Sequence, residues 1–276
     1  LLAELPEMDW PDKIKIAQTN WIGKSEGAEI TFQVDGGDDT ITVFSTRPDT
    51  IFGATFLVLA PEHPLARTLL TDETRELVEN YINDAVKKSE IERSNDTKEK
   101  TGVFSGSYAI NPATGQKIPI WIADYVLGGY GTGAVMGVPA HDDRDFAFAE
   151  KFELPVVEVI ERPEDDIDTD ACYHGEGVLV NSGAFDGTRS EDAREQIVAW
   201  LEQEGKGKSQ ITYKMRDWLI SRQRYWGAPI PIIYCPEHGA VPVPESDLPV
   251  LLPDVDDFQP RGDGKSVLAA QEDWVQ

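Results

Sequence analysis

A polar segment, Ser45-Thr46-Arg47-Pro48-Asp49-Thr50, gathers hydroxyl groups, a guanidinium and a carboxylate directly after a predicted strand. Pro48 fixes its own backbone and restricts the residue before it, so the chain must leave regular structure there. Hydroxyls and a guanidinium at such a turn are able to orient a polar substrate and a water molecule. The same composition also describes an ordinary polar turn, and the segment alone does not decide between the two interpretations.

A second polar group, Val138-Pro139-Ala140-His141-Asp142-Asp143-Arg144-Asp145, lies at the start of a predicted helix. The helix N-terminus favours the ionised form of Asp142 and Asp145, and an ionised carboxylate in a pocket suits a positively charged amine. The alternative is purely structural, with Asp142 as the N-cap and Asp145 bonding back to it. His141 is a candidate general base, or simply a hydrogen-bonded histidine.

The elements around these groups predict an α+β fold with a β-rich, barrel-like core and peripheral helices. Alternating apolar residues and turn signals predict strands at 29–34, 40–44, 56–60, 106–110, 117–124, 155–161, 176–180 and 229–234. One helix is predicted from Thr71, with a buried stripe of Leu77, Val78, Tyr81, Ile82, Ala85 and Val86. Another is predicted from a capping Ser190 to Gly205, with Ala193, Ile197, Trp200 and Leu201 facing inward.

Composition limits the class of protein. The 276 residues include 50 acidic and 25 basic side chains, which gives a net charge of −25. This charge disfavours an autonomous nucleic-acid binder. It is also what we would expect of a protein from a salt-loving source. No apolar run approaches the roughly 18 residues of a membrane span. Two cysteines are too few for a disulfide scaffold and fit a reducing cytoplasm. The chain begins without Met or a signal peptide, so we expect an excised fragment.

Metal and nucleotide motifs are weak. The pairs Cys235/His238 and Cys172/His174 would make a tetrahedral zinc site only if the fold brought them together, and we predict no metal. Gly131-Thr132-Gly133 lacks the rest of a dinucleotide fingerprint, and no phosphate loop is present.

The two polar groups, in this order, resemble the editing insertion of bacterial-type leucyl-tRNA synthetases. So do the segments Trp21-Ile22-Gly23-Lys24-Ser25, Tyr130-Gly131-Thr132-Gly133-Ala134-Val135-Met136 and Arg216-Asp217-Trp218-Leu219-Ile220-Ser221-Arg222-Gln223-Arg224-Tyr225-Trp226-Gly227. The resemblance covers nearly the whole chain. The Arg-Pro-Asp-Thr core differs from the Thr-Pro-Trp-Thr typical of isoleucyl and valyl relatives. The synthetic signatures His-Ile-Gly-His and Lys-Met-Ser-Lys-Ser are absent, so we expect a fragment that edits without forming adenylate.

This resemblance implies a domain plan and partners. Residues 1–22 would be a linker, 23–214 the editing domain, and 215–276 a return linker with part of the class I synthetase body. The partners implied are the 3′-terminal adenosine of tRNA for leucine, noncognate amino acids and the rest of the synthetase chain, with no membrane. Editing would need no cofactor, whereas the full-length enzyme would use ATP and Mg²⁺.

The resemblance also implies a role for each matching residue. Thr46 and Arg47 would lie at the hydrolytic centre near the adenosine, and Thr50 would exclude leucine. Asp145 would bind the α-ammonium group and count with Thr46 and Arg47 as catalytic. Substrate contacts would come from Ser45 (where many relatives have Thr), Thr50, Tyr130, Met136, Val138, His141 and Asp142.

The implied function is post-transfer editing, the hydrolysis of norvalyl-, isoleucyl- or methionyl-tRNA for leucine. Hydrophobic pockets separate substrates that differ by one methylene by only about 1–3 kcal/mol, so a second, hydrolytic pocket is needed. Two alternatives stay open: an editing domain of an isoleucyl or valyl enzyme, and a non-catalytic module that positions tRNA.

Overall fold

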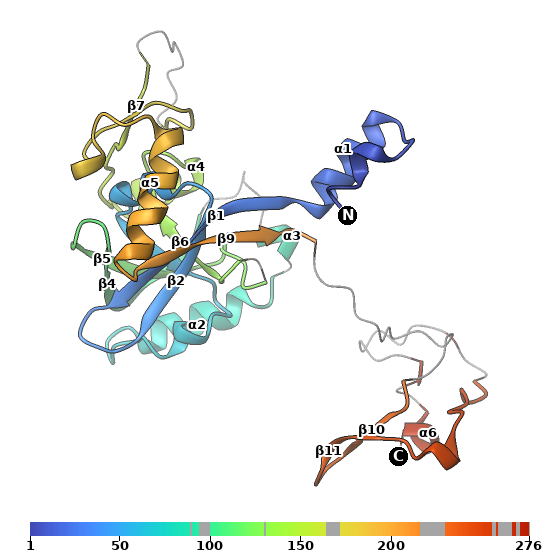
Figure 1. Cartoon of the computed structure of the whole chain (residues 1–276). Helices are drawn as coiled ribbons and strands as arrows, with labels where there is room; N and C mark the ends of the chain where they lie inside the picture. The colour runs from blue at the N-terminus through green and yellow to red at the C-terminus, as the bar shows by residue number, and fades with distance from the viewer. Residues whose placement is uncertain are drawn as a thin grey trace. The chain divides into compact units, whose positions relative to one another are not determined.

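The computed structural model describes residues 1–88, 90–93, 100–129, 131–163, 172–215, 230–255, 258, 267–268 and 271–275 (Figure 1). The chain divides into two compact units, Leu1–Met215 and Arg216–Gln276. The strands of the first unit are β1 (Lys24–Val34), β2 (Thr40–Ser45), β3 (Phe56–Leu59), β4 (Gly102–Ile110), β5 (Lys117–Ala123), β6 (Ala134–Gly137), β7 (Ile160–Glu161), β8 (Val178–Leu179) and β9 (Gly207–Tyr213). Its helices are α1 (Asp12–Ile22), α2 (Arg75–Ala85), α3 (Glu90–Arg93), α4 (Asp143–Lys151) and α5 (Ser190–Gln203), with short 3₁₀ turns η1 (Leu5–Glu7), η2 (Pro48–Gly53), η3 (Pro64–Arg67) and η4 (Gly183–Phe185).

The β1–β2 hairpin is confirmed, and its alternating sequence explains it. Ile30 pairs with Val43 and Phe32 pairs with Ile41, so the apolar residues of both strands share one face. All four side chains are fully buried. The strand is longer than predicted, because Lys24–Ile30 also pair with β9, a strand that the sequence analysis missed.

The hairpin belongs to a seven-stranded sheet with the order β2-β1-β4-β5-β3-β6, to which β9 adds along β1. β3 runs parallel to β5 and antiparallel to β6, so the segment after β3 and the segment after β6 leave opposite ends of adjacent strands. The predicted mixture of helices and strands is confirmed. A barrel is not confirmed, because among the described strands β2 and β6 lie in contact without being paired.

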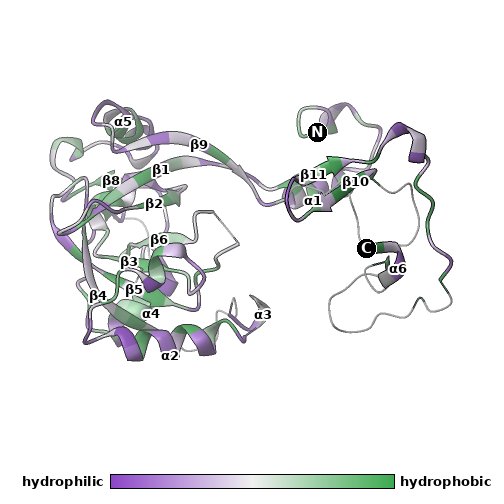
Figure 2. Ribbon diagram, turned by 90° about the horizontal axis from the view of Figure 1, so that it is seen from below, coloured by the Kyte–Doolittle hydropathy of each residue, from purple (hydrophilic) through white to green (hydrophobic). Residues whose placement is uncertain are grey.

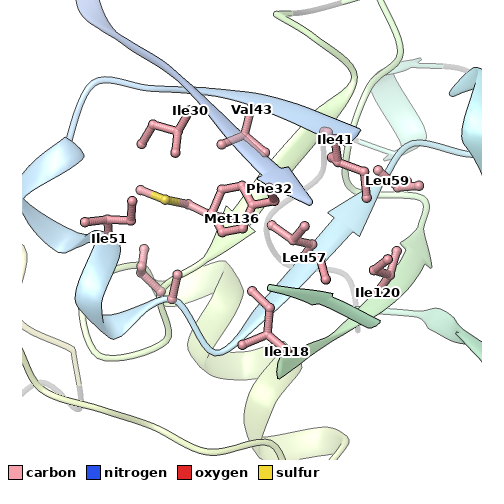
Figure 3. Close-up of a cluster of buried hydrophobic side chains, with 14 of the residues drawn as sticks. Ile30, Phe32, Ile41, Val43, Ile51, Leu57, Leu59, Ile118, Ile120 and Met136 are labelled. Atoms are coloured by element: carbon pink, nitrogen blue, oxygen red, sulfur yellow. The ribbon is translucent and has the colours of Figure 1, made fainter. Parts of the chain in front are cut away.

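The hydrophobic core packs against this sheet. Figure 3 shows Phe32, Leu57 and Met136 from three different strands pointing toward one another, with Ile51 of η2 at their edge. The strand β3 is buried along its whole length and is entirely hydrophobic (Figure 2). Because η2 contributes Ile51 to the core, the turn that precedes it is tied to the packed interior.

Two helix predictions need correction. The stripe of α2 is Val78, Ile82 and Ala85, with Tyr81 beside it, whereas Leu77 and Val86 are 62% and 46% exposed. The reason is geometric, since Leu77 is one residue, about 100°, away from the buried line around the helix axis. In α5, Ser190 is the first helical residue and not the N-cap, and its hydroxyl bonds to the side chain of another segment, as described below.

The second unit holds a hairpin of β10 (Ile232–Cys235) and β11 (Gly239–Pro242), the 3₁₀ turn η5 (Glu245–Asp247) and the short α6 (Glu272–Val275). The predicted strand at 229–234 corresponds to β10, although residue 229 lies outside the described residues. Within the described parts of the chain, no helix combines the length and hydrophobicity needed to cross a membrane.

Candidate functional site

One cavity of about 470 Å³ brings the two polar groups together. The first group is the Thr/Arg turn, residues 45–50, and the second is the aspartate loop, residues 138–145. The volume lies in the range of roughly 300–1,000 Å³ that is usual for small-ligand sites. The predicted residues that line this cavity are Ser45, Thr46, Arg47, Thr50, Met136, Val138, His141, Asp142 and Asp145.

The Thr/Arg turn begins where β2 ends and is fixed by its own hydrogen bonds. Ser45 Oγ accepts from the Arg47 backbone N–H at 3.0 Å, a turn that serine commonly stabilises. The Thr50 hydroxyl donates to the Arg47 carbonyl at 2.9 Å, and Thr50 is buried. Thr46 is exposed between them. The Thr46 side chain is therefore exposed between Ser45 and Thr50, whose hydroxyl groups are held by hydrogen bonds within the turn.

Gly27 of β1 allows the turn to pass close to the sheet. A Cβ atom at this position would lie 2.2 Å from the Ser45 carbonyl oxygen, well inside any tolerated contact. Gly27 is adjacent to the Ala28–Ser45 pair, the last of the β1–β2 register. The sequence alone does not predict this role for Gly27, because a lone glycine in a strand indicates a close approach without identifying the neighbouring group.

The side chain of Arg47 is oriented by the protein. Its Nε donates to Asp49 Oδ1 at 3.1 Å and its Nη2 donates to Asp49 Oδ2 at 2.9 Å. Nη1 donates to the His174 carbonyl at 3.1 Å. Most of the guanidinium N–H groups thus have protein acceptors, so Arg47 lines the cavity in a fixed orientation.

In the aspartate loop, Asp142 is the N-cap of α4. Its Oδ1 accepts from the backbone N–H groups of Arg144 at 2.9 Å and Asp145 at 3.2 Å. Its Oδ2 accepts from Arg144 Nη2 at 3.2 Å. The capping interpretation is therefore confirmed for Asp142, whose carboxylate already has these partners within the protein.

Asp145 does not bond back to the cap residue, contrary to the capping-box alternative. It is 6% exposed, and its Oδ2 accepts from the Val138 N–H at 2.9 Å while its Oδ1 accepts from the Tyr125 hydroxyl at 3.2 Å. Burial, and then the nearby charge of Asp142, raise the pKa of Asp145 to about 7. The expectation that the helix N-terminus would keep Asp145 ionised is corrected, because desolvation outweighs the helix dipole here.

His141 lines the cavity, but both of its ring nitrogens bond to the backbone. Nδ1 lies 2.9 Å from the Tyr173 carbonyl oxygen, and Nε2 accepts from the Val159 N–H at 3.1 Å. This pattern requires the neutral ring, and burial lowers the pKa of His141 accordingly. The geometry does not support the general-base alternative, since neither nitrogen is available to a substrate.

The apolar side of the cavity comes from the sheet. Met136 of β6 is 6% exposed and packs against the core residues of Figure 3 while also lining the cavity. Val138 follows the end of the same strand and is also buried. Tyr130, the third predicted residue of this group, lies outside the described residues.

Four of the polar or charged lining residues had no predicted role in the site: Tyr125, Arg93, Lys100 and Arg144. Tyr125 directly follows the turn residue after β5 and reaches Asp145 across the fold. Arg93 is buried and donates to the Asp124 and Val126 carbonyls at 2.8 Å each. Periodicity carries no signal for such contacts, because they depend on the tertiary arrangement and not on spacing along the chain.

The two cysteine–histidine pairs belong to different compact units of the chain. Cys235 Sγ lies 3.4 Å from His238 Nδ1, while the buried Cys172 thiol donates to the Pro139 carbonyl at 3.2 Å. Burial raises the pKa of Cys172 to about 12, so this thiol is not a ready metal ligand. Over the part of the chain that the structure describes, no three His, Cys, Asp or Glu side chains are grouped to hold a metal ion.

Comparison with known proteins identifies the family. Residues 19–202, more than half of the chain, match the family model described as "Leucyl-tRNA synthetase, editing domain". The chain belongs to the leucyl-tRNA synthetase editing-domain family. Residues 190–249 also match the family model described as "tRNA synthetases class I (I, L, M and V)".

Members of the leucyl-tRNA synthetase family show the same likeness over almost the whole chain. This chain is 55% identical over 263 residues to the leucine–tRNA ligase of Rubrobacter xylanophilus, and the match covers 95% of this chain and 32% of that protein. A solved structure, the ternary complex of Agrobacterium radiobacter K84 agnB2 LeuRS with tRNA and LeuAMS, matches with a TM-score of 0.74 and 38% identity, over 99% of this chain and 30% of that one. The chain thus spans about a third of the length of these relatives. The isoleucyl or valyl alternative is not retained, because the editing-domain model that matches is the leucyl one.

Proposed function

We propose that this chain is the editing part of a leucine–tRNA ligase and hydrolyses the ester bond of mischarged tRNA for leucine. The observation that carries the proposal is the single cavity in which the Thr/Arg turn faces the aspartate loop. Norvaline, isoleucine and methionine are the amino acids to be removed. The substrate is the amino acid esterified to the 3′-terminal adenosine.

Asp145 binds the α-ammonium group of the aminoacyl ester. Each of its oxygens accepts one protein hydrogen bond, and a carboxylate oxygen has a second lone pair for a ligand. Because burial holds the pKa of Asp145 at about 7, the arriving cation pairs with a carboxylate that has already lost its water. Asp142 holds Arg144 and the start of α4 in place beside this site.

The Thr/Arg turn supplies the reacting centre. An aminoacyl ester is already activated, so the protein needs to orient a water molecule and the ribose hydroxyls more than it needs to supply a nucleophile. Thr46 is exposed on the turn, between Ser45, whose hydroxyl accepts from the backbone, and Arg47, whose guanidinium is fixed. These contacts support Thr46 and Arg47 as the residues that act at the scissile ester and the adenosine.

Thr50 rejects leucine by shape. Its rotamer is set by the hydrogen bond to the Arg47 carbonyl, and it is 1% exposed at the cavity wall. A branched γ-carbon collides with a fixed wall, whereas the unbranched norvaline side chain passes. Met136 and Val138 form the apolar wall against which the accepted side chain packs.

The surrounding protein supplies the rest of the proposed activity. Residues 1–22 and 215–276 connect the editing domain, 23–214, to the synthetase body, where ATP and Mg²⁺ serve the synthetic reaction in the cytoplasm. Arg47, Lys100 and Arg144 line the cavity, so basic groups gather locally in a chain of net charge −25. This distribution suits a terminal nucleotide that is delivered by contacts made elsewhere in the ligase.

A single-turnover assay with the chain in excess over norvalyl-tRNA and leucyl-tRNA for leucine tests this function. We expect release of norvaline and retention of leucine. If no amino acid is released at any salt concentration, the chain is a non-catalytic module that positions tRNA, and the proposed hydrolysis is wrong.

Thr50→Ala tests the discriminating wall in the same assay. We expect the variant to release leucine as well, because the cavity gains room for the γ-branch. Thr55→Ala is the matched control, since Thr55 is also a buried threonine and is not part of the cavity wall. Continued retention of leucine by Thr50→Ala would remove Thr50 as the discriminator.

A further inference from the structure

A partly buried ionic network connects the Thr/Arg turn to another part of the fold. Asp49 is fully buried, and its carboxylate accepts from two arginines that come from different elements. Arg47 donates from within the turn, and Arg194 Nε of α5 donates to Asp49 Oδ1 at 3.2 Å. Arg194 lies 145 residues further along the chain, so the turn is tied to a distant helix.

Arg194 is itself held by a third charge. Its Nη2 donates to both carboxylate oxygens of Glu176, at 2.5 and 2.7 Å. Glu176 also accepts from the Ser190 hydroxyl at 2.5 Å. Although burial opposes it, the hydrogen bonds from Arg194 and Ser190 lower the pKa of Glu176, so this group stays ionised near neutral pH. Arg194 therefore bridges two carboxylates with the two sides of one guanidinium.

The bridge acts on the residues that face the substrate. Asp49 and its neighbour Thr50 belong to the same 3₁₀ turn, η2, against which α5 packs. Asp49 also fixes the guanidinium of Arg47, whose carbonyl sets the hydroxyl of Thr50. A displacement of Asp49 would therefore move both the Arg47 guanidinium, which it binds, and Thr50, its neighbour in η2.

We propose that Arg194, held by Glu176, is a positioning residue for editing: through Asp49 it fixes the Thr/Arg turn and sets the discrimination against leucine. This inference rests on the proposed function and extends it, since neither Arg194 nor Glu176 lines the cavity. Arginine suits this position because its planar fork serves Asp49 and Glu176 together, whereas the ammonium group of lysine pairs well with only one of them.

The experiment compares Arg194→Gln, Arg194→Lys and Glu176→Gln with the wild-type chain in single-turnover deacylation of norvalyl- and leucyl-tRNA. The quantity measured is the ratio of the two rate constants, normalised to folded protein. A shift of about 1 Å in a reacting group is able to change rates by about 100-fold, so we expect Arg194→Gln to lower the ratio at least roughly tenfold. We expect Arg194→Lys to lower this ratio less than Arg194→Gln does. Glu176→Gln should also lower the ratio, by a smaller factor.

Arg189→Gln is the matched control. It removes an ion pair with Glu191 at the start of the same helix, where both side chains are mostly exposed, and it should leave the ratio unchanged. A folded Arg194→Gln chain with the wild-type ratio would overturn the inference while the proposed function stands. If Arg194→Gln does not fold, Glu176→Gln decides, and an unchanged ratio there overturns the inference. A wild-type chain that releases no norvaline removes the proposed function itself, and the inference with it.

Discussion

Replacing Asp145 by asparagine removes the charge of an enclosed carboxyl group while keeping an oxygen that accepts from the Val138 N–H. The amide also offers a donor to the Tyr125 hydroxyl. Alanine is a poorer probe, because it leaves both of these buried groups without their partner, at a cost of about 1–3 kcal/mol each. Asp145→Asn therefore isolates the effect of the charge.

The size of the effect follows from the pKa of Asp145, which burial raises from an ordinary 3.8 to about 7. Each unit corresponds to 1.36 kcal/mol, so the shift of about three units is worth about 4 kcal/mol. The protonated form is the one that the folded state favours. Between about pH 4 and pH 7 the folded chain binds more protons at Asp145 than the unfolded chain does, so raising the pH lowers the free energy of unfolding. Below this pH range Asp145 does not change the free energy of unfolding, and above it the full destabilisation is present.

Denaturant unfolding of the wild type and Asp145→Asn at pH 4 and pH 8 measures this directly, because the other titrating groups cancel in the comparison. We expect the free energy of unfolding of the variant, relative to wild type, to be about 4 kcal/mol higher at pH 8 than at pH 4. The variant should also lose at least about 30-fold in norvalyl-tRNA hydrolysis, since truncating one partner of a buried charge pair costs about 2–5 kcal/mol. A stability difference that is the same at both pH values would show that folding does not raise the pKa of Asp145, and would refute the predicted effect of its burial.

Two further predictions concern groups that hold the site in place. Tyr125→Phe removes a hydrogen bond that lowers the pKa of Asp145. In the wild type we expect the rate of norvaline release to rise with pH around pH 7, and in the variant this rise should move to higher pH. A shift to lower pH would contradict this account. Gly27→Ala places a Cβ atom 2.2 Å from the Ser45 carbonyl oxygen and should cost about 1–3 kcal/mol of stability together with most of the hydrolysis. Gly37→Ala, in the open hairpin turn where a Cβ meets nothing closer than 4.0 Å, is its control, and equal effects of the two substitutions would show that the crowding at Gly27 is unimportant.

Local pattern was sufficient for the elements that carry the site. Ile30 and Phe32 alternate with polar residues, and Gly36 and Gly37 make the turn, so the hairpin was predictable from a few neighbouring residues. Asp142 was predictable as an N-cap in the same way, because capping involves only the next three residues. The resemblance to the leucyl family then placed the Thr/Arg turn and the aspartate loop in one site, and the cavity contains both.

The tertiary structure alone decided the chemistry of the individual groups. The sequence predicts an ionised Asp145 and leaves His141 as either a general base or a hydrogen-bonded histidine, but enclosure raises the pKa of Asp145 and hydrogen bonds occupy both nitrogens of His141. Likewise, nothing in the spacing of residues couples Asp49 to Arg194, whose contact spans 145 positions. Periodicity reports which face of an element is buried, whereas desolvation and long-range ion pairs depend on what the folded chain places against that face, and these set the protonation and the orientation of the groups that act on a substrate.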